Sequence, residues 1–175
     1  PIRDFLDFRK KHLAEFFKKA YPVAINEIAW GMGTVVLNLI YSNLGYEYYA
    51  AVTIERTFES LAFALLIGLC SACAIMVGNS VGAGDIAQGV DQARRFVVIE
   101  PLLAICLGGG LIAAHRPLIY LFNTGGGLSD LTYRSAVLIL CLYGAHMITR
   151  NVPYITIVGI YRAGGDTVTG VKYDM

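Results

Sequence analysis

Long apolar stretches separated by short polar ones run along the chain, and their lengths predict helices that cross a membrane. The segment 22–43 is nearly uncharged, and a helix of that length rises about 33 Å, which matches a bilayer core of about 30 Å. Similar segments occupy about 47–82, 95–114 and 129–161. Because 47–82 and 129–161 are longer than a bilayer core is thick, parts of them must protrude or line a wet cavity. The pattern predicts an all-α, polytopic transmembrane helix bundle with about four spans.

A basic segment, residues 1–20, precedes the first predicted span. Its apolar side chains lie roughly along one helical stripe and its basic side chains largely elsewhere, as in a helix that rests on a membrane surface. A plain solvated linker whose lysines fix the orientation of the spans explains the same pattern. Under both interpretations the segment is cytoplasmic. We expect an amphipathic cytoplasmic linker helix at 1–20, followed by a partial transmembrane lobe at 21–175.

The two ends of the chain predict a piece of a longer polypeptide. The opening residues are charged, lack a leading Met and contain no apolar core of a signal peptide. The last residues, 165–175, break off where a further apolar segment would start. We therefore expect additional spans outside this chain.

The composition fits an integral membrane protein, since 56% of the residues are hydrophobic and only 15% are charged. A formal net charge of +1 and the lack of a basic face argue against a nucleic-acid partner. Of the 14 basic residues, two (Arg56 and Arg150) fall within predicted helices. With the amino terminus inside, ten of the others are cytoplasmic and only Arg116 and Arg134 are outside. This asymmetry predicts a cytoplasmic amino terminus.

Glu27 stands within the membrane depth of the first span and is the strongest functional candidate. An ionisable group there costs about 2.5 kcal/mol or more unless it faces protein or water, so its presence is a functional hypothesis by default. Residues of the same helical face and of the neighbouring row complete a candidate cation- and substrate-binding set: Asn26, Trp30, Thr34, Asn38 and Tyr41. This set would present a carboxylate, amides and aromatic rings to an organic cation. The alternative is a polar stripe that only joins helices through hydrogen bonds.

The second span carries a possible proton carrier. Glu55 and Glu59 are one helical turn apart, and repulsion between them would favour proton uptake, which makes Glu59 a candidate for a proton-linked step. The alternative is that Arg56, also one turn from Glu59, pairs with it and neutralises it. The spacing alone leaves both open.

The fourth span is polar and contains a proline. Tyr143, His146, Arg150 and Tyr154 share one face, and Pro153 removes a helical hydrogen bond beside them. A kinked polar helix can move, and an unperturbed histidine titrates near pH 6.5. His146 and Arg150 are therefore further candidate site residues. The alternative for His146 is a hydrogen-bonded packing role.

Glycines and other small residues predict turns and close contacts. Two predicted helices end in a glycine turn followed by aspartate, at 81–85 and 162–166. Glycine there supplies a left-handed helix end and aspartate can cap the next helix. Gly68, Gly78 and Gly82 lie in patterns of small residues four apart, which predict close approach between helices.

The chain shows no catalytic signature. It has no serine-hydrolase elbow, no nucleotide-binding P-loop and no zinc-protease motif, so nothing in the sequence indicates an enzyme, an ATP-driven pump or a cofactor. Cys70 and Cys73 lie in an apolar helical run, and Cys106 and Cys141 are isolated. We therefore expect these thiols to pack against neighbours and not to hold a metal.

Several short stretches, in this order, resemble the multidrug and toxic compound extrusion (MATE) family of secondary antiporters. They are PVAINEIAW at 22–30, IYSNLG at 40–45, AAVTI at 50–54, GLCSA at 68–72, VGNSVGAG at 77–84 and YRAGGDT at 161–167. Each stretch is weak by itself, whereas the ordered set is specific and spans nearly the whole chain.

The resemblance implies a twelve-helix, two-lobe transporter of the plasma membrane, such as a bacterial or archaeal inner membrane. It would export small organic, often cationic, compounds in exchange for a cation, with this chain as roughly the seventh to tenth helices. Glu27 matches the acid of the seventh helix that the family uses for cation and drug coupling. Some members carry a further acid on the tenth helix, where this chain has His146 and Arg150, so we expect protons in preference to sodium. The implied partners are the bilayer, the substrate and the missing amino-terminal lobe.

Two other functions stay open on the sequence. A lipid-linked sugar flippase of the same broad superfamily would be expected to have a more cationic cavity, which Glu27 and the aromatic row disfavour. A non-transporting four-helix membrane scaffold would need no carboxylate within 22–43. Replacing Glu27 would leave such a scaffold unaffected.

Overall fold

The computed structural model describes the backbone of residues 10–123 and 127–174, and the side chains from residue 13 onward within these ranges. This described part is helical and contains no strand, which confirms the predicted all-α class. Its elements are α1 (Lys10–Asn43), α2 (Tyr46–Gly82), α3 (Ile86–Ala113), α4 (His115–Tyr120), the 3₁₀-helix η2 (Leu121–Asn123), α5 (Asp130–Tyr154), the π-helix η3 (Ile155–Arg162) and α6 (Thr167–Asp174). The first nine residues of the predicted linker lie outside the described residues.

Four stretches of the described chain are long and apolar enough to cross a membrane. They are Leu13–Asn43, Tyr46–Gly82, Ile86–Ala113 and Asp130–Arg162. The last of them joins α5 to η3 without a break. The predicted polytopic bundle with four spans is therefore confirmed in length and composition.

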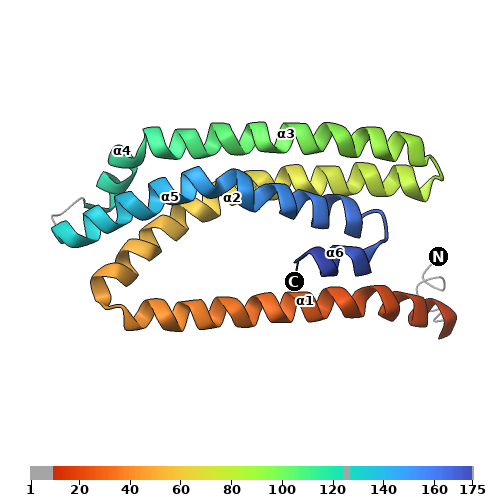
Figure 1. Cartoon of the computed structure of the whole chain (residues 1–175), viewed down its shortest axis with the longest axis horizontal. Coiled ribbons are helices and arrows are strands. Elements are labelled where there is room, and N and C mark those ends of the chain that lie inside the picture. Colours follow the sequence, from red (N-terminus) through yellow and green to blue (C-terminus); the bar gives the residue numbers. More distant parts are fainter. Residues whose placement is uncertain (1–9, 124–126, 175) are drawn as a thin grey trace, which may run out of the picture.

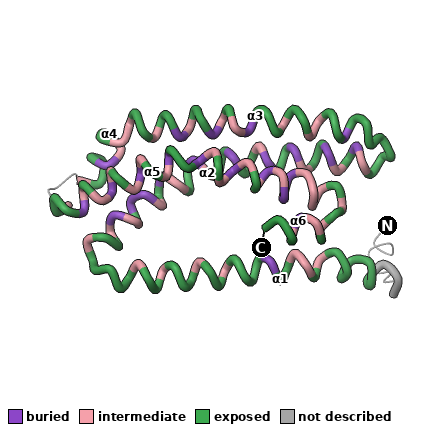
Figure 2. The backbone as a smooth tube through the Cα atoms, viewed as in Figure 1, coloured by how far each residue is buried: buried purple, intermediate pink, exposed green. Residues whose placement is uncertain are grey.

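Helices α2, α3 and α5 pack against one another, whereas α1 lies apart from them (Figure 1). Helix α1 meets α2 near their shared turn and is bridged to the rest of the molecule by α6, which lies between α1 and η3 (Figure 1). Figure 2 shows α1 exposed along almost its whole length, and only 6% of its most apolar stretch is buried. This separation places the clefts of the candidate site between α1 and the bundle.

The four long helices alternate in direction, so their connections gather at two ends (Figure 1). The start of α1, the turn between α2 and α3 and the turn between η3 and α6 share one end (Figure 1). The described basic residues that were assigned to the cytoplasm lie in these segments or on the helices beside them: Lys10, Lys11, Lys18, Lys19, Arg94, Arg95, Arg162 and Lys172. The alternation is the arrangement that the positive-inside asymmetry requires, while the orientation in the membrane stays a prediction.

Two helix boundaries differ from the sequence prediction. Pro22 lies inside α1 and not at the first turn of a separate span. The reason is that the stretch before it is rich in lysine, alanine and other good helix formers, which continue the helix outward past the bilayer core. Helix α3 begins at Ile86, well before the predicted start at 95. Asp85 fixes this start, because its carboxylate accepts a hydrogen bond from the backbone N–H of Gln88 at 2.9 Å.

The two predicted glycine and aspartate turns are confirmed. Gly84 and Gly165 have φ angles of 84° and 86°, in the left-handed region that favours glycine. Asp85 and Asp166 then cap the next helix, and the Asp166 carboxylate accepts from the backbone N–H of Thr169 at 3.1 Å. Hydrogen bonds from the Thr169 side chain and backbone hold the pKa of the exposed Asp166 below its usual value.

Helices α3 and α5 touch through two buried glycines. A Cβ atom on Gly108 would lie 2.3 Å from the carbonyl oxygen of Gly144, and one on Gly144 would lie 2.8 Å from that of Gly108. Among the described residues there is no close approach at Gly68 and Gly82, since a Cβ atom on either would meet none of their atoms within 4 Å. At Gly78 it would make only an ordinary contact, at 3.5 Å. The helix crossings, which spacing within one helix does not reveal, decide which small residues meet.

The cysteines of α2 belong to the apolar core, as predicted. Cys70 and Cys73 are buried in a cluster with Val77 and Ile155, and the Cys73 thiol lies 3.6 Å from the carbonyl oxygen of Gly159 in η3. The described residues contain no group of three or more His, Cys, Asp or Glu side chains that could hold a metal ion. These thiols therefore contribute packing.

Candidate functional site

A cleft of about 950 Å³ lies between α1, α2 and α5. Six of the predicted site residues line it: Trp30, Thr34 and Tyr41 from α1, Glu59 from α2, and His146 and Arg150 from α5. Pockets that hold small organic molecules typically measure about 300–1,000 Å³, so this cleft is large enough for one. The consecutive helices α1 and α2 and the distant helix α5 thus line one cleft.

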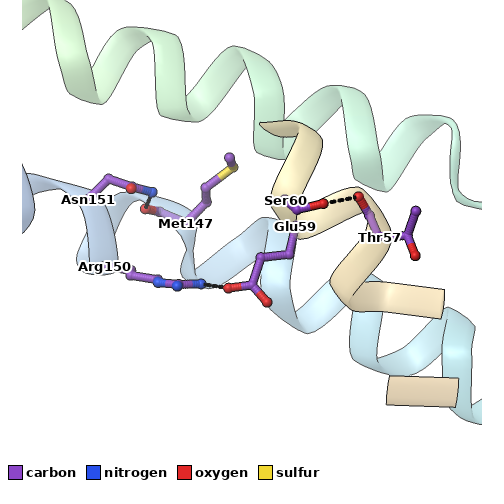
Figure 3. Close-up of polar contacts among 6 residues, drawn as sticks. All are labelled: Thr57, Glu59, Ser60, Met147, Arg150 and Asn151. Atoms are coloured by element: carbon purple, nitrogen blue, oxygen red, sulfur yellow. Dashed lines mark hydrogen bonds and ion pairs between the residues drawn. The ribbon is translucent and has the colours of Figure 1, made fainter. Parts of the chain in front are cut away.

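Glu59 and Arg150 form an ion pair at this cleft, with α2 supplying the acid and α5 the guanidinium (Figure 3). The alternative that Arg56 pairs with Glu59 is wrong, because packing of α5 against α2 brings a different arginine to the carboxylate. The Glu59 side chain is 23% exposed and the Arg150 side chain 33%, so solvent screens this pair less than a surface pair. The guanidinium carbon of Arg150 also lies 5.1 Å and 5.8 Å from the ring centroids of Phe63 and Tyr143.

Arg56 contacts α1 instead. Its guanidinium donates to the side-chain oxygen of Asn38 and lies 5.6 Å from the ring centroid of Tyr41. Figure 1 shows α2 bending, so that its first part runs toward α1. The hydroxyls of Thr57 and Ser60 donate to carbonyl oxygens four and three residues earlier, a contact that often bends helices. The bend explains why Arg56 faces α1 and leaves Glu59 to Arg150.

Glu55 is a cleft residue that the sequence pattern did not single out. It is 7% exposed and lines the cleft together with Glu59. Its spacing of one turn from Glu59 was the available signal. Spacing shows that two acids are neighbours, but the rotation of α2 against α5 decides which of them is the more deeply buried.

Glu27 faces a second, smaller cavity of about 200 Å³. Its Oε1 atom lies 2.7 Å from Nη1 of Arg162, the last residue of η3. Nη2 of Arg162 lies 3.7 Å from Oδ2 of Asp174 in α6, and Asn26 donates a hydrogen bond to the same Asp174 carboxylate. Arg162 is therefore shared between two acids, while Asn26 is 5% exposed. The cluster joins α1, η3 and α6.

The two cavities are neighbours, because Trp30 and Phe63 line both. The structure thus brings all nine predicted site residues to one region in which α1 faces α2, α5, η3 and α6. Glu27 lines the smaller cavity and Asn26 holds a carboxylate of its wall, while Asn38 reaches the cleft through its hydrogen bond to an arginine of α2. Their roles in binding stay predictions.

Arg162 and Asp174 are site residues that the sequence pattern missed. Arg162 belongs to one of the predicted glycine turns and was counted among the ten cytoplasmic cations. It is 135 residues from Glu27, so no spacing within a helix reports their contact. Only the packing of α6 between α1 and η3 places the arginine beside the acid.

Replacing Arg150 with methionine is expected to destabilise the protein, because Glu59 then loses its partner in a partly buried wall. Removing one partner of a fully buried pair costs about 3–5 kcal/mol, and the partial exposure here reduces the expected loss to about 1–3 kcal/mol. Thermal unfolding of the complete protein in detergent measures the loss. The double variant with Glu59→Gln should recover most of it. If the double variant lost as much stability as the sum of the losses in the two single variants, the pairing would be contradicted.

Comparisons with known proteins agree with the membrane architecture. The family model named MatE matches residues 22–173, starting at the first residue of the first predicted span. The protein "Probable multidrug resistance protein NorM" of Thermotoga maritima is 26% identical over 110 residues, which are 63% of this chain and 24% of that protein. The match therefore spans about a quarter of the length of that relative. No solved structure matches the chain.

Proposed function

The chain belongs to the MatE family, and on this premise we propose that the complete protein is a secondary antiporter of the plasma membrane. It exports small organic, often cationic, compounds in exchange for a cation. In this proposal the chain supplies roughly the seventh to tenth helices of a twelve-helix transporter, with its amino terminus in the cytoplasm. The similarity to a protein whose name describes multidrug resistance supports the substrate class.

The observation that carries the proposal is the cleft of about 950 Å³ with acids and aromatic rings in its wall. Glu55 and Glu59 contribute negative charge, and Arg56 and Arg150 of the same lining balance it until an arriving cation displaces them. Trp30, Tyr41 and Phe63 contribute ring faces, and Arg56 and Arg150 already lie beside the rings of Tyr41 and Phe63. Carboxylates and ring faces both attract an organic cation, the rings by about 0.5–2 kcal/mol each depending on how far water is excluded. A scaffold without transport would not need this combination in a membrane.

Glu27 is the proposed binding group for the coupling cation or the drug. In the structure its carboxylate is paired with Arg162, so an arriving proton or organic cation competes with that guanidinium. When the arriving cation neutralises Glu27, Arg162 keeps only the longer contact to Asp174. Binding of a cation to Glu27 therefore weakens the contact between α1 and η3. This supplies a physical route from binding to a change in helix packing.

We favour a proton as the coupling ion. A sodium ion needs several oxygen ligands around it, whereas Glu27 and Glu59 each have an arginine as their immediate neighbour. A proton neutralises a carboxylate without a coordination shell, so it can bind beside an arginine. His146, which lines the cleft, is a further group that can take up a proton.

Transport by the complete protein tests the proposal. Ethidium export in sodium-free proteoliposomes is expected to respond to an imposed pH gradient. Export that requires a sodium gradient and ignores pH would show that proton coupling is wrong while leaving the exporter intact. Ethidium movement no greater than in empty liposomes under either gradient would contradict the exporter itself and favour another cargo, such as a lipid-linked sugar.

A further inference from the structure

A buried acid lies outside both cavities, between α2, α3 and α5. Glu100 of α3 is 2% exposed, and its Oε2 atom has no hydrogen-bond partner in the part of the chain that the structure describes. An ionised carboxylate at this place would carry an uncompensated charge in an apolar medium. The free-energy cost of such a charge is so high that a buried acid normally takes up a proton and becomes neutral. A neutral Glu100 could instead donate a hydrogen bond to a neighbouring acceptor.

Asn151 of α5 is a second buried polar group with an unused atom. It is 1% exposed, and its side-chain nitrogen donates to the carbonyl oxygen of Met147 at 2.7 Å (Figure 3). Since only the amide nitrogen can bond to a carbonyl, this contact fixes the orientation of the amide. The amide oxygen Oδ1 then points away and has no donor among the described residues. It needs an N–H or O–H group, which a carboxylate does not have.

The register of α3 against α5 places these two residues in the same layer. The two helices run in opposite directions, and Gly108 contacts Gly144 directly (Figure 1). One turn further on, Ala104 and Met147 are buried in one cluster. The next turn along the same faces brings Glu100 opposite Asn151, since steps of three or four residues keep one helical face. Figure 3 agrees, because Asn151 lies on the α3 side of α5 whereas Arg150 points toward Glu59.

We propose that Glu100 is a proton-binding site, held as a neutral carboxylic acid whose O–H donates to Oδ1 of Asn151. This single hydrogen bond satisfies the otherwise unused acceptor of Asn151 and removes the unpaired charge from the interior. The proposal concerns the α2, α3 and α5 interface and does not depend on which solute the cleft takes.

No ion pair to Glu100 is formed by the residues that the structure describes. From α2 the ionisable neighbour is the buried Cys70 thiol. On α5 the register derived above places the neutral Asn151 and Met147 on the face toward Glu100. Arg162 of η3 is the cation that interacts with Cys70, and it is already paired with acids at the smaller cavity. Uptake of a proton is the remaining way to neutralise Glu100.

Loss of the proton would change the contacts of α5. An ionised Glu100 accepts hydrogen bonds only, so the amide of Asn151 would have to turn its nitrogen toward the carboxylate and give up the Met147 carbonyl. This change would take place two residues before Pro153, close to the junction of α5 with η3. The site would therefore make the packing of α3 on α5 dependent on proton binding.

Infrared spectroscopy of the complete protein in lipid bilayers tests the site directly. A protonated carboxylic acid has a carbonyl stretching band that neither a carboxylate nor an amide shows. We expect this band at neutral pH in the unaltered protein, its loss in Glu100→Gln, and its retention in the control Glu15→Gln, which alters an exposed acid of α1. Glu100→Gln keeps both the shape and the neutrality of the side chain, so the variant is expected to fold with unchanged thermal stability.

The variant Asn151→Leu tests the proposed hydrogen bond independently of whether Glu100 is protonated. Without an acceptor, the carbonyl band of Glu100 should move to higher frequency, as for a carboxylic acid with no hydrogen bond. A spectrum at neutral pH in which Glu100→Gln removes no protonated-acid band would overturn the proposal. A band that Asn151→Leu leaves at the same frequency would overturn the assigned partner.

Discussion

Replacing Glu27 with glutamine is expected to reduce ethidium export by the complete protein to the background of empty vesicles. The substitution keeps the size of the side chain and removes the charge that pairs with Arg162 at 2.7 Å. A neutral amide holds a proton or an organic cation far less strongly than a carboxylate does, so the proposed exchange has no binding group. Export in inverted vesicles, normalised to the amount of protein, measures the effect.

Two further variants show why export is lost. Glu15→Gln changes the same residue type in the same helix at an exposed position, and export should be unchanged. Glu27→Gln also leaves Arg162 without its nearest partner, which by itself could disturb the fold. The double variant with Arg162→Gln removes that unpaired cation. If Glu27 served only to neutralise Arg162, the double variant would regain export, and the proposed role of Glu27 would be wrong.

Replacing Gly108 with alanine is expected to destabilise the protein by about 1–3 kcal/mol, the usual cost of forcing extra atoms into a packed interior. The new Cβ atom would lie 2.3 Å from the backbone oxygen of Gly144, which has no flexible side chain to move aside. Helices α3 and α5 would have to separate. The change lies two turns from Glu100 and in the same interface, so it would also weaken the contact proposed there.

Gly109→Ala is the matched control for this prediction. Gly109 is the next residue of α3, is exposed, and has nothing within 4 Å of the position of a new Cβ atom. Alanine is also a better helix former than glycine, so this variant should be as stable as the unaltered protein or slightly more so. Thermal unfolding of both variants in the same detergent compares them. Equal loss of stability at 108 and 109 would show that helix propensity, and not the contact with Gly144, explains the effect.

The local features of this protein could be predicted from its sequence. Its four long apolar stretches fixed the helical class and the number of candidate spans, because a bilayer forces the backbone to satisfy its own hydrogen bonds. Gly84 and Gly165 marked two turns, since few other residues adopt a positive φ. The sequence also showed that Glu27, Thr34 and Tyr41 lie on one helical face. In the structure Thr34 and Tyr41 line the large cleft, and Glu27 lines the smaller cavity beside it. Such features depend only on neighbours along one helix.

Which helix faces meet, and therefore which partners the charged groups have, depends on how the helices pack. Glu59 pairs with Arg150 and not with Arg56, because α5 packs against α2 while the bend of α2 turns Arg56 toward α1. Glu27 meets Arg162 across 135 residues through the placement of α6 and η3. Burial of Glu100 likewise follows from the register that the α3 and α5 glycines set. Hydrophobic periodicity gives the direction in which a side chain leaves its own helix, but the energy of an ion pair or a buried acid depends on what the other helices bring to it.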